Sequence, residues 1–86
     1  MNNLIKYYIN KLTIKDVSNF AISKNIHLSN DELNFTYNFI KNNYEEIFIY
    51  KKNFNIDKYK NYFSEENFPK IKTLLTEYLI KFNNYL

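Results

Sequence analysis

An apolar stripe near the C-terminus of this 86-residue chain sets the strongest limit on how it folds. Large apolar residues recur there three and four positions apart, at Phe68, Ile71, Leu74, Leu75, Tyr78, Leu79 and Phe82. This period predicts an amphipathic helix with one face against a core. Ser64 suits the N-cap of this helix, and Glu65 and Glu66 suit its first turn. Pro69 lies near enough to the start to be tolerated.

The N-terminal part of the chain predicts two more amphipathic helices. In residues 3–12 the apolar residues that share one face are Leu4, Ile5, Tyr8, Ile9 and Leu12. Thr13 then caps a second helix, with Asp16 in the first turn. The expected buried face of that helix consists of Ile14, Val17, Phe20 and Ala21. The helix should end near Lys24, because Asn25 tolerates the left-handed conformation that usually requires glycine.

A short connector leads into a third helix. Residues 26–28 alternate apolar and polar side chains, which suits an extended segment. Ser29 and Glu32 have the spacing of a capping box, in which each side chain bonds the backbone N–H of the other residue. We therefore expect a helix from Asn30. Its apolar stripe consists of Leu33, Tyr37, Ile40 and Tyr44.

Residues 43–52 allow three interpretations. The third helix breaks or kinks near Asn42–Asn43, or it continues because helical spacing persists as far as Ile47. In the third interpretation residues 46–50 form a strand, because β-branched and aromatic residues are frequent there. We expect the break or kink. Beyond a polar connector, a short helix is predicted from Ile56, Tyr59, Tyr62 and Phe63.

Together these segments predict an all-α fold, a small bundle of four to five short helices with a helix-extended-helix unit in the N-terminal half. No glycine-rich or proline-rich linker divides the chain, and its length fits a single helical domain over residues 1–86. The first residues lack the apolar segment of a secretory signal, and no apolar run approaches the length of a membrane span. We therefore expect a cytoplasmic protein with no membrane partner.

The composition excludes most of the common types of catalytic site. Without cysteine there is no thiolate nucleophile and no cysteine-based zinc site, and His27 is the sole histidine for a triad or a metal. Ser29 is explained as a helix cap, and the two pairs of adjacent glutamates point in different directions on a helix. The absence of glycine excludes the usual phosphate-binding loops. We expect no enzyme, no catalytic residue, no cofactor, no metal site and no small-molecule substrate.

The remaining features favour binding. Four large apolar residues outside the predicted stripes are candidates for a surface that binds a protein partner or a second copy: Phe35, Phe39, Ile80 and Tyr85. The net charge of +3 allows an acidic partner, and lysines interleaved with aromatic residues can pair with phosphates beside stacked bases. The candidates for such nucleic-acid contacts are Lys51, Lys52, Lys58 and Lys60. The leading hypothesis is a non-catalytic protein-interaction or self-associating module; the alternative is weak, sequence-independent nucleic-acid binding.

The segment from Leu12 to Asn43 resembles the helix-extended-helix layout of SAP- and LEM-type modules. Two short helices flank the extended residues 26–28, as in those modules. The resemblance implies binding to DNA or to a DNA-binding partner. The chain departs from the pattern at Asn25, where glycine is usual, and its second helix offers only Lys41 as a cation.

A longer resemblance covers about half of the chain. It is carried by Ile9, Lys11, Leu12, Thr13, Asp16, Val17, Ile26, Leu28, Ser29, Asp31, Glu32, Ile47 and Phe48. A proline then opens a C-terminal amphipathic helix, as Pro69 does here. These features resemble the YqfT-like proteins, an uncharacterised family of low-GC Gram-positive bacteria. The resemblance implies a helical fold and a cytoplasmic location and leaves the activity open.

Overall fold

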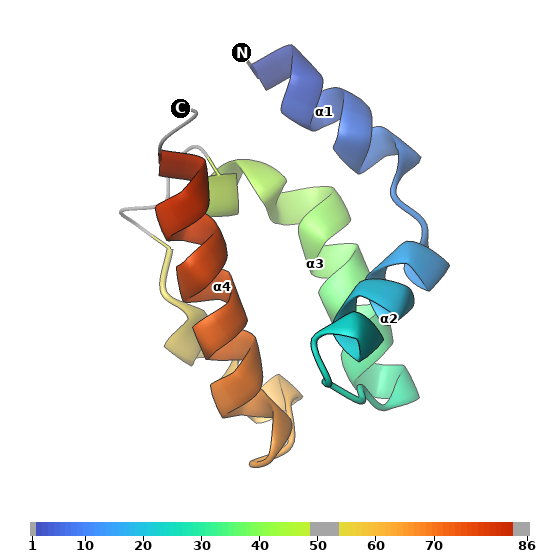
Figure 1. The fold of residues 1–86 in the computed structure, drawn as a ribbon, viewed down its shortest axis with the longest axis vertical. Coiled ribbons are helices and arrows are strands. Elements are labelled where there is room, and N and C mark those ends of the chain that lie inside the picture. Colours follow the sequence, from blue (N-terminus) through green and yellow to red (C-terminus); the bar gives the residue numbers. More distant parts are fainter. Residues whose placement is uncertain (1, 49–53, 84–86) are drawn as a thin grey trace. The chain divides into compact units, whose positions relative to one another are not determined.

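The computed structural model describes residues 2–48 and 54–83, which are helical except for short connectors (Figure 1). In chain order the elements are α1 (Asn2–Lys11), α2 (Ile14–Ser23), α3 (Asn30–Phe48), the 3-10 helix η2 (Ile56–Tyr62) and α4 (Asn67–Asn83). No strand occurs among the described residues, and the predicted all-α fold is confirmed.

The chain divides into two compact units, unit 1 (Met1–Tyr44) and unit 2 (Glu45–Leu86). The boundary lies just after Asn43, whose φ of −129° and ψ of 21° interrupt the helical geometry of α3. The predicted kink is therefore confirmed. The strand alternative is wrong for residues 46–48, which are helical, while residues 49–50 lie outside the described part of the chain. A single domain over the whole chain stays a prediction.

Capping boxes close both helix starts that follow a connector in unit 1. The backbone N–H of Thr13 donates to Asp16 Oδ2 (3.0 Å), and the N–H of Asp16 donates to Thr13 Oγ1 (3.1 Å). In the same way, the N–H of Ser29 donates to Glu32 Oε1 (2.8 Å) and the N–H of Glu32 to Ser29 Oγ (3.2 Å). The predicted caps are confirmed. Each box satisfies two N–H groups that the first turn of a helix would otherwise leave unpaired.

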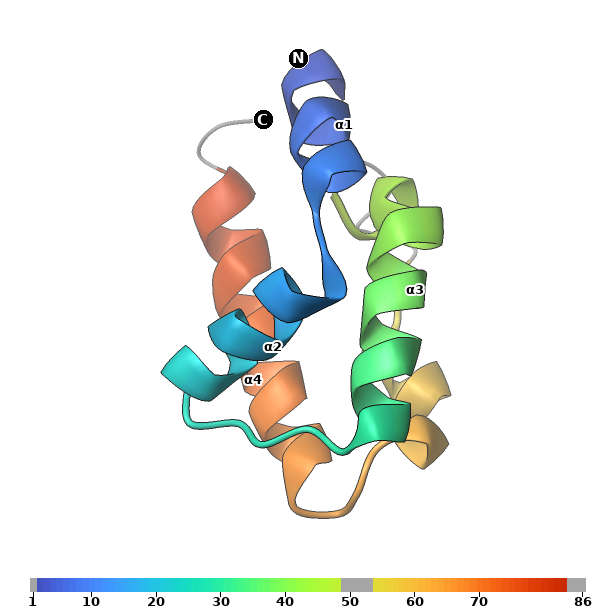
Figure 2. The same cartoon turned by 90° about the vertical axis from the view of Figure 1, so that its right-hand side faces the viewer.

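The end of α2 depends on Asn25. Its φ of 61° places it in the left-handed region, as the sequence predicts. The N–H of Ile26 donates to Ala21 O and the N–H of Asn25 to Ile22 O, both at 2.9 Å, which is the bond pair of a Schellman motif. This turn buries Ile26 beside the helix end and leads through the extended connector into α3 (Figure 2).

The buried apolar side chains of unit 1 are Ile9, Val17, Ala21 and Ile26. The predicted inward faces of the first two helices are therefore wrong in part. Leu4 and Tyr8 of α1 and Ile14 and Phe20 of α2 are exposed. In α2 the buried pair lies one turn apart, so Ile14 and Phe20 fall at the two edges of the inward stripe.

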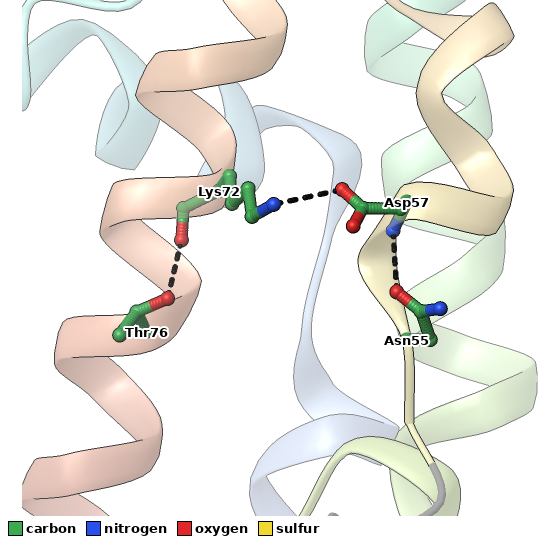
Figure 3. A network of polar contacts seen from close by, with 4 residues as sticks. All are labelled: Asn55, Asp57, Lys72 and Thr76. Carbon is green, nitrogen blue, oxygen red and sulfur yellow. Dashed lines mark hydrogen bonds and ion pairs between the residues drawn. The ribbon is translucent and has the colours of Figure 1, made fainter.

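In unit 2 an exposed ion pair connects η2 to α4. Lys72 Nζ donates to Asp57 Oδ1 at 2.9 Å, and the N–H of Asp57 donates to Asn55 Oδ1 at 3.0 Å, which caps the 3-10 helix (Figure 3). Figure 3 also shows the hydroxyl of Thr76 donating to the backbone oxygen of Lys72 one turn along α4. The short helix predicted from Ile56 onward is confirmed and is of the 3-10 type.

The start of α4 lies two residues later than predicted. Ser64 Oγ accepts the N–H of Asn67 (3.0 Å) as a cap does, but α4 begins at Asn67, so Glu65 and Glu66 precede its first turn. The physical reason is Pro69, which has no N–H to bond the carbonyl of Glu65.

The predicted apolar stripe of α4 is partly buried. Phe68 is buried, with its ring centroid 6.4 Å from that of Phe63, and Ile71, Leu74 and Leu75 are half-buried. The side chains of the remaining stripe residues lie outside the described part of the structure: Tyr78, Leu79 and Phe82.

Candidate functional site

Among the described side chains of helix α1, three large apolar ones are exposed. Leu4 and Tyr8 are each 62% exposed and Tyr7 is 51% exposed. They stand at positions i, i+3 and i+4 of a helix and therefore share one side of it. We call these three residues the α1 face. Single exposed apolar residues are normal on protein surfaces, whereas a contiguous group of them indicates an interaction site.

Lys11 extends the α1 face by one turn. It stands seven positions after Leu4, and its Nζ lies 4.7 Å from the centroid of the Tyr7 ring. An ammonium at this distance is attracted by the negative face of the ring. The edge of one ring of the Tyr7–Tyr8 pair meets the face of the other, with centroids 5.6 Å apart and an interplanar angle of 77°. These contacts orient Tyr7 within the exposed surface.

The opposite side of α1 holds the helix in unit 1. Ile9 is buried there, and Leu12, the residue after the helix, is half-buried. Lys41 of α3 donates from Nζ to the backbone oxygens of Ile9 (2.8 Å) and Asn10 (3.0 Å). Carbonyls in the last turn of a helix have no partner within the helix and carry the negative end of its dipole, so this lysine caps α1. The cap and Ile9 fix which side of α1 faces outward.

The surroundings of the α1 face are basic. Lys6, Lys11 and Lys15 are exposed, and residues 1–15 contain no acid. Of the three acids of unit 1, Asp16 and Glu32 accept hydrogen bonds in their own capping boxes. These two carboxylates therefore compensate the positive ends of α2 and α3, and they do not offset the positive charge of the lysines around α1.

Helix α2 also exposes apolar residues, but they form no single stripe. Ile14, Phe20 and Ile22 are exposed. Phe20 and Ile22 are two positions apart, and residues at that spacing project from different sides of a helix. The residues of α2 therefore do not provide a second surface comparable with the α1 face.

The structure describes the side chains of two of the four interface residues predicted from the sequence, and the predicted interface stays a prediction. Phe35 and Phe39 are half-buried on α3, with ring centroids 5.8 Å apart. Ile80 lies in α4 with its side chain outside the described part, and Tyr85 lies outside the described residues altogether. Sequence reasoning missed the α1 face because it assigned Leu4 and Tyr8 to the core. The acid-free stretch around them was the available signal.

The lysine-rich segment of unit 2 is a second candidate site. Lys58 and Lys60 are exposed on η2, whereas Lys51 and Lys52 lie outside the described residues. Asp57, the acid nearest to these lysines in the sequence, is held by Lys72.

Aromatic rings accompany these lysines. Phe54 and Tyr59 stack with centroids 6.1 Å apart, Tyr59 and Tyr62 lie 6.4 Å apart, and Tyr62 is more than half exposed. Burial raises the pKa of Tyr59 above its ordinary value of 10.0, and the negative charge of Glu46 adds to this effect. The phenol of Tyr59, the middle ring of this series, therefore stays neutral at neutral pH.

The residues considered for catalysis have structural partners or lie apart. Ser29 accepts the N–H of Glu32 as a helix cap, and His27 is exposed on the connector. Within residues 2–48 and 54–83, no three or more His, Cys, Asp or Glu side chains are grouped as they would be to hold a metal ion. None of the described helices combines the length and the apolar character needed to cross a membrane.

Comparisons with known proteins give no match: no family model, no curated protein and no solved structure is similar to this chain at a significant level. The resemblances to YqfT-like proteins and to SAP- and LEM-type modules stay predictions.

Proposed function

We propose that this protein is a non-catalytic interaction module that binds another protein through the α1 face. The observation that carries the proposal is the exposure of Leu4, Tyr7 and Tyr8 on one side of a helix whose other side is fixed by Ile9 and Lys41. A cytoplasmic location accords with a chain that has no cysteine.

The spacing of the α1 face matches a known mode of protein recognition. Amphipathic helices that enter a groove on a partner present anchors at positions i, i+3, i+4 and i+7. Tyrosine is enriched in the centres of interfaces because it combines a large apolar ring with a hydroxyl that can bond at the rim. Truncation of such an anchor commonly costs about 2 kcal/mol or more of binding free energy. We therefore expect Tyr7 and Tyr8 to dominate the affinity.

Site-specific photo-crosslinking in the native cell tests the proposal. Tyr8→p-benzoylphenylalanine places a photoreactive ring on the α1 face, and Asn34→p-benzoylphenylalanine places it on an exposed position of α3 in the same unit as a control. We expect a defined protein adduct from position 8 and none from position 34. Leu4→Ala combined with Tyr7→Ala should abolish the adduct while leaving the melting temperature nearly unchanged, since both residues are exposed.

Two results would contradict the proposal. The first is the same set of adducts from positions 8 and 34, which indicates unspecific contact. The second is an adduct that persists in the double variant at full yield, which shows that the α1 face does not carry the binding.

A second candidate function is weak, sequence-independent binding of single-stranded nucleic acid by the η2 segment. It is favoured by the Lys72–Asp57 pair, which neutralises the acid beside Lys58 and Lys60. Affinity for a homopolymeric single strand should fall with salt, and Lys58→Ala with Lys60→Ala should reduce the slope of log affinity against log salt by about 1.4. Lys70→Ala is the matched control, because Lys70 already faces Glu66 at 3.8 Å. An unchanged slope in the double variant excludes this segment as the site.

A further inference from the structure

We infer that the partner bound by the α1 face is an acidic protein surface, in which an Asp or Glu carboxylate pairs with Lys11 at one end of an apolar groove. The inference rests on the proposed function and names the chemistry of the partner. It also states that the partner is not a second copy of this chain.

The first step is the position of Lys11. Leu4, Tyr7 and Tyr8 supply the anchors at i, i+3 and i+4, and the fourth anchor position is occupied by an ammonium group instead of an apolar side chain. Its Nζ lies over the Tyr7 ring at 4.7 Å and is therefore held on the contact surface. A groove that covers this face also covers Lys11. Burial of a charge without a partner is costly, so a complementary groove must present an anion at that point.

The second step is the charge around the face. Lys6 lies in α1 and Lys15 in the first turn of α2, and residues 1–15 contain no acid that could supply this anion. Asp16 accepts the Thr13 N–H at 3.0 Å in its own capping box. The carboxylate must therefore come from the partner. The surrounding lysines would steer an acidic surface toward α1 and make association depend on ionic strength.

The third step excludes self-association through this face. In a two-fold contact the same patch is present on both copies, so two acid-free segments of residues 1–15 would be brought together. Juxtaposed like charges oppose such a contact. The apolar anchors of α1 alone would allow a dimer, but the lysines disfavour it.

Zero-length crosslinking with a carbodiimide tests the inference, because this reagent joins a lysine amine directly to a carboxylate that lies against it. Once capture through position 8 has identified the partner, the complex of the wild-type protein with that partner is isolated, treated with the reagent and analysed by peptide mass spectrometry. We expect an amide bond from Lys11 to an Asp or Glu of a different protein. Lys24 is the control, because its Nζ lies over the Phe20 ring at 5.8 Å in the same kind of cation–π contact but Lys24 stands at the C-cap of α2.

Binding of the purified partner gives a second readout. Lys11→Glu should weaken affinity at least about tenfold, because it replaces an attraction by a repulsion, and Lys11→Arg should retain binding while losing the carbodiimide adduct. Lys24→Glu should leave affinity unchanged.

The outcomes separate this inference from the function on which it rests. Loss of capture in the Leu4→Ala, Tyr7→Ala variant together with full binding by Lys11→Glu overturns the inference alone. A partner identified as a second copy, a lipid or a nucleic acid also overturns it. Absence of any specific adduct from position 8 overturns both.

Discussion

The helix starts of the two units are built differently. In unit 1 each of α2 and α3 opens with a reciprocal capping box, from Thr13 and Asp16 and from Ser29 and Glu32. In unit 2 the residue that donates its N–H to the Ser64 cap is Asn67, whose side chain is a neutral amide. The acid in each box of unit 1 adds a negative charge at the positive end of its helix, which Asn67 does not supply to α4.

The described cores of the two units also differ in the side chains that fill them. The buried apolar residues of unit 1 are aliphatic and include Ile26, which is 2% exposed. In unit 2 the buried apolar residues are Ile47 and Phe68, Phe68 lies near Phe63, and a separate series of rings runs along η2. Aliphatic side chains pack mainly by filling space, whereas pairs of aromatic rings also favour particular angles and centroid distances. Substitutions at Ile26 and at Phe68 therefore test two different kinds of packing.

The largest effects are expected from truncation of the two cores. Phe68→Ala should lower the free energy of unfolding by about 3 kcal/mol and Ile26→Ala by about 2 kcal/mol, because each removes a buried side chain and leaves a cavity. Urea denaturation of the whole chain measures both. If one common transition shifts in both variants, the two units fold as the single domain that the sequence predicts. Separate shifts would show two domains. Phe68→Leu and Ile26→Val, each expected to cost about 1 kcal/mol, serve if the alanine variants fail to fold.

The capping boxes of unit 1 should differ from each other in strength. Thr13→Ala should cost about 0.5–1 kcal/mol, as for an exposed N-cap, and Ser29→Ala about 1–2 kcal/mol. The second value is larger because Glu32 is only 5% exposed, so removal of the Ser29 hydroxyl takes the acceptor away from the backbone N–H of a buried residue. Ser29→Thr keeps a hydroxyl and should recover most of the loss. Equal costs for the two alanine variants in urea denaturation would contradict this ranking.

The features that the sequence predicted correctly depend on residues a few positions apart. The caps at Thr13 and Ser29, the left-handed Asn25 and the kink at Asn43 each follow from the conformational preference of a short segment. Such preferences act before the chain packs, so a single sequence displays them. The start of α4 was misplaced because the cap signal and Pro69 compete within the same turn.

The orientation of α1 could not be predicted from its own pattern. Its apolar residues surround more than half of the helix, and the side that faces inward is selected by contacts with α3. The decisive lysine, Lys41, is 32 residues away from Ile9 in the sequence, and no local rule connects them. The basic character of residues 1–15 was visible in the sequence. Its meaning depended on the exposure of Leu4 and Tyr8, which only the structure shows.

Two lysines provide a finer comparison of the units. Lys41→Met should destabilise the chain by about 1 kcal/mol, because it removes a partly buried cap from the carbonyls of Ile9 and Asn10. Lys72→Met removes an exposed pair with Asp57 and should cost about 0–0.5 kcal/mol. Thermal unfolding at low salt measures both. A larger loss for Lys72→Met would show that the link between η2 and α4 is more important for stability than its exposure implies.

A smaller effect is expected in unit 2 at alkaline pH. The pKa of Tyr59 is raised above 10.0, first by burial and then by the charges of Glu46 and Tyr62. Because the folded-state pKa is raised, stability is complete below the unfolded value near 10 and falls as pH rises through the folded value. Tyr59→Phe should flatten this alkaline decline. Unfolding curves collected from neutral pH upward, with Tyr37→Phe in unit 1 as the control, test the assignment. An equal flattening in both variants would contradict it.

The smallest effect should occur in unit 1 at acidic pH. The hydrogen bond from the Thr13 backbone N–H, followed by the bond that involves its hydroxyl, lowers the pKa of Asp16 below 3.8. A lowered folded-state pKa stabilises the fold above the unfolded value, and this contribution disappears as pH falls below 3.8 through the folded value. Asp16→Asn keeps an oxygen that can accept the Thr13 N–H but does not titrate, so its acid decline should be slightly shallower than that of the wild type. Asp31→Asn, which alters an exposed acid outside both capping boxes, is the matched control. Since Asp16 is exposed, a difference between the two variants that vanishes at high salt would show that the charge, and not the geometry of the box, gives unit 1 its acid sensitivity.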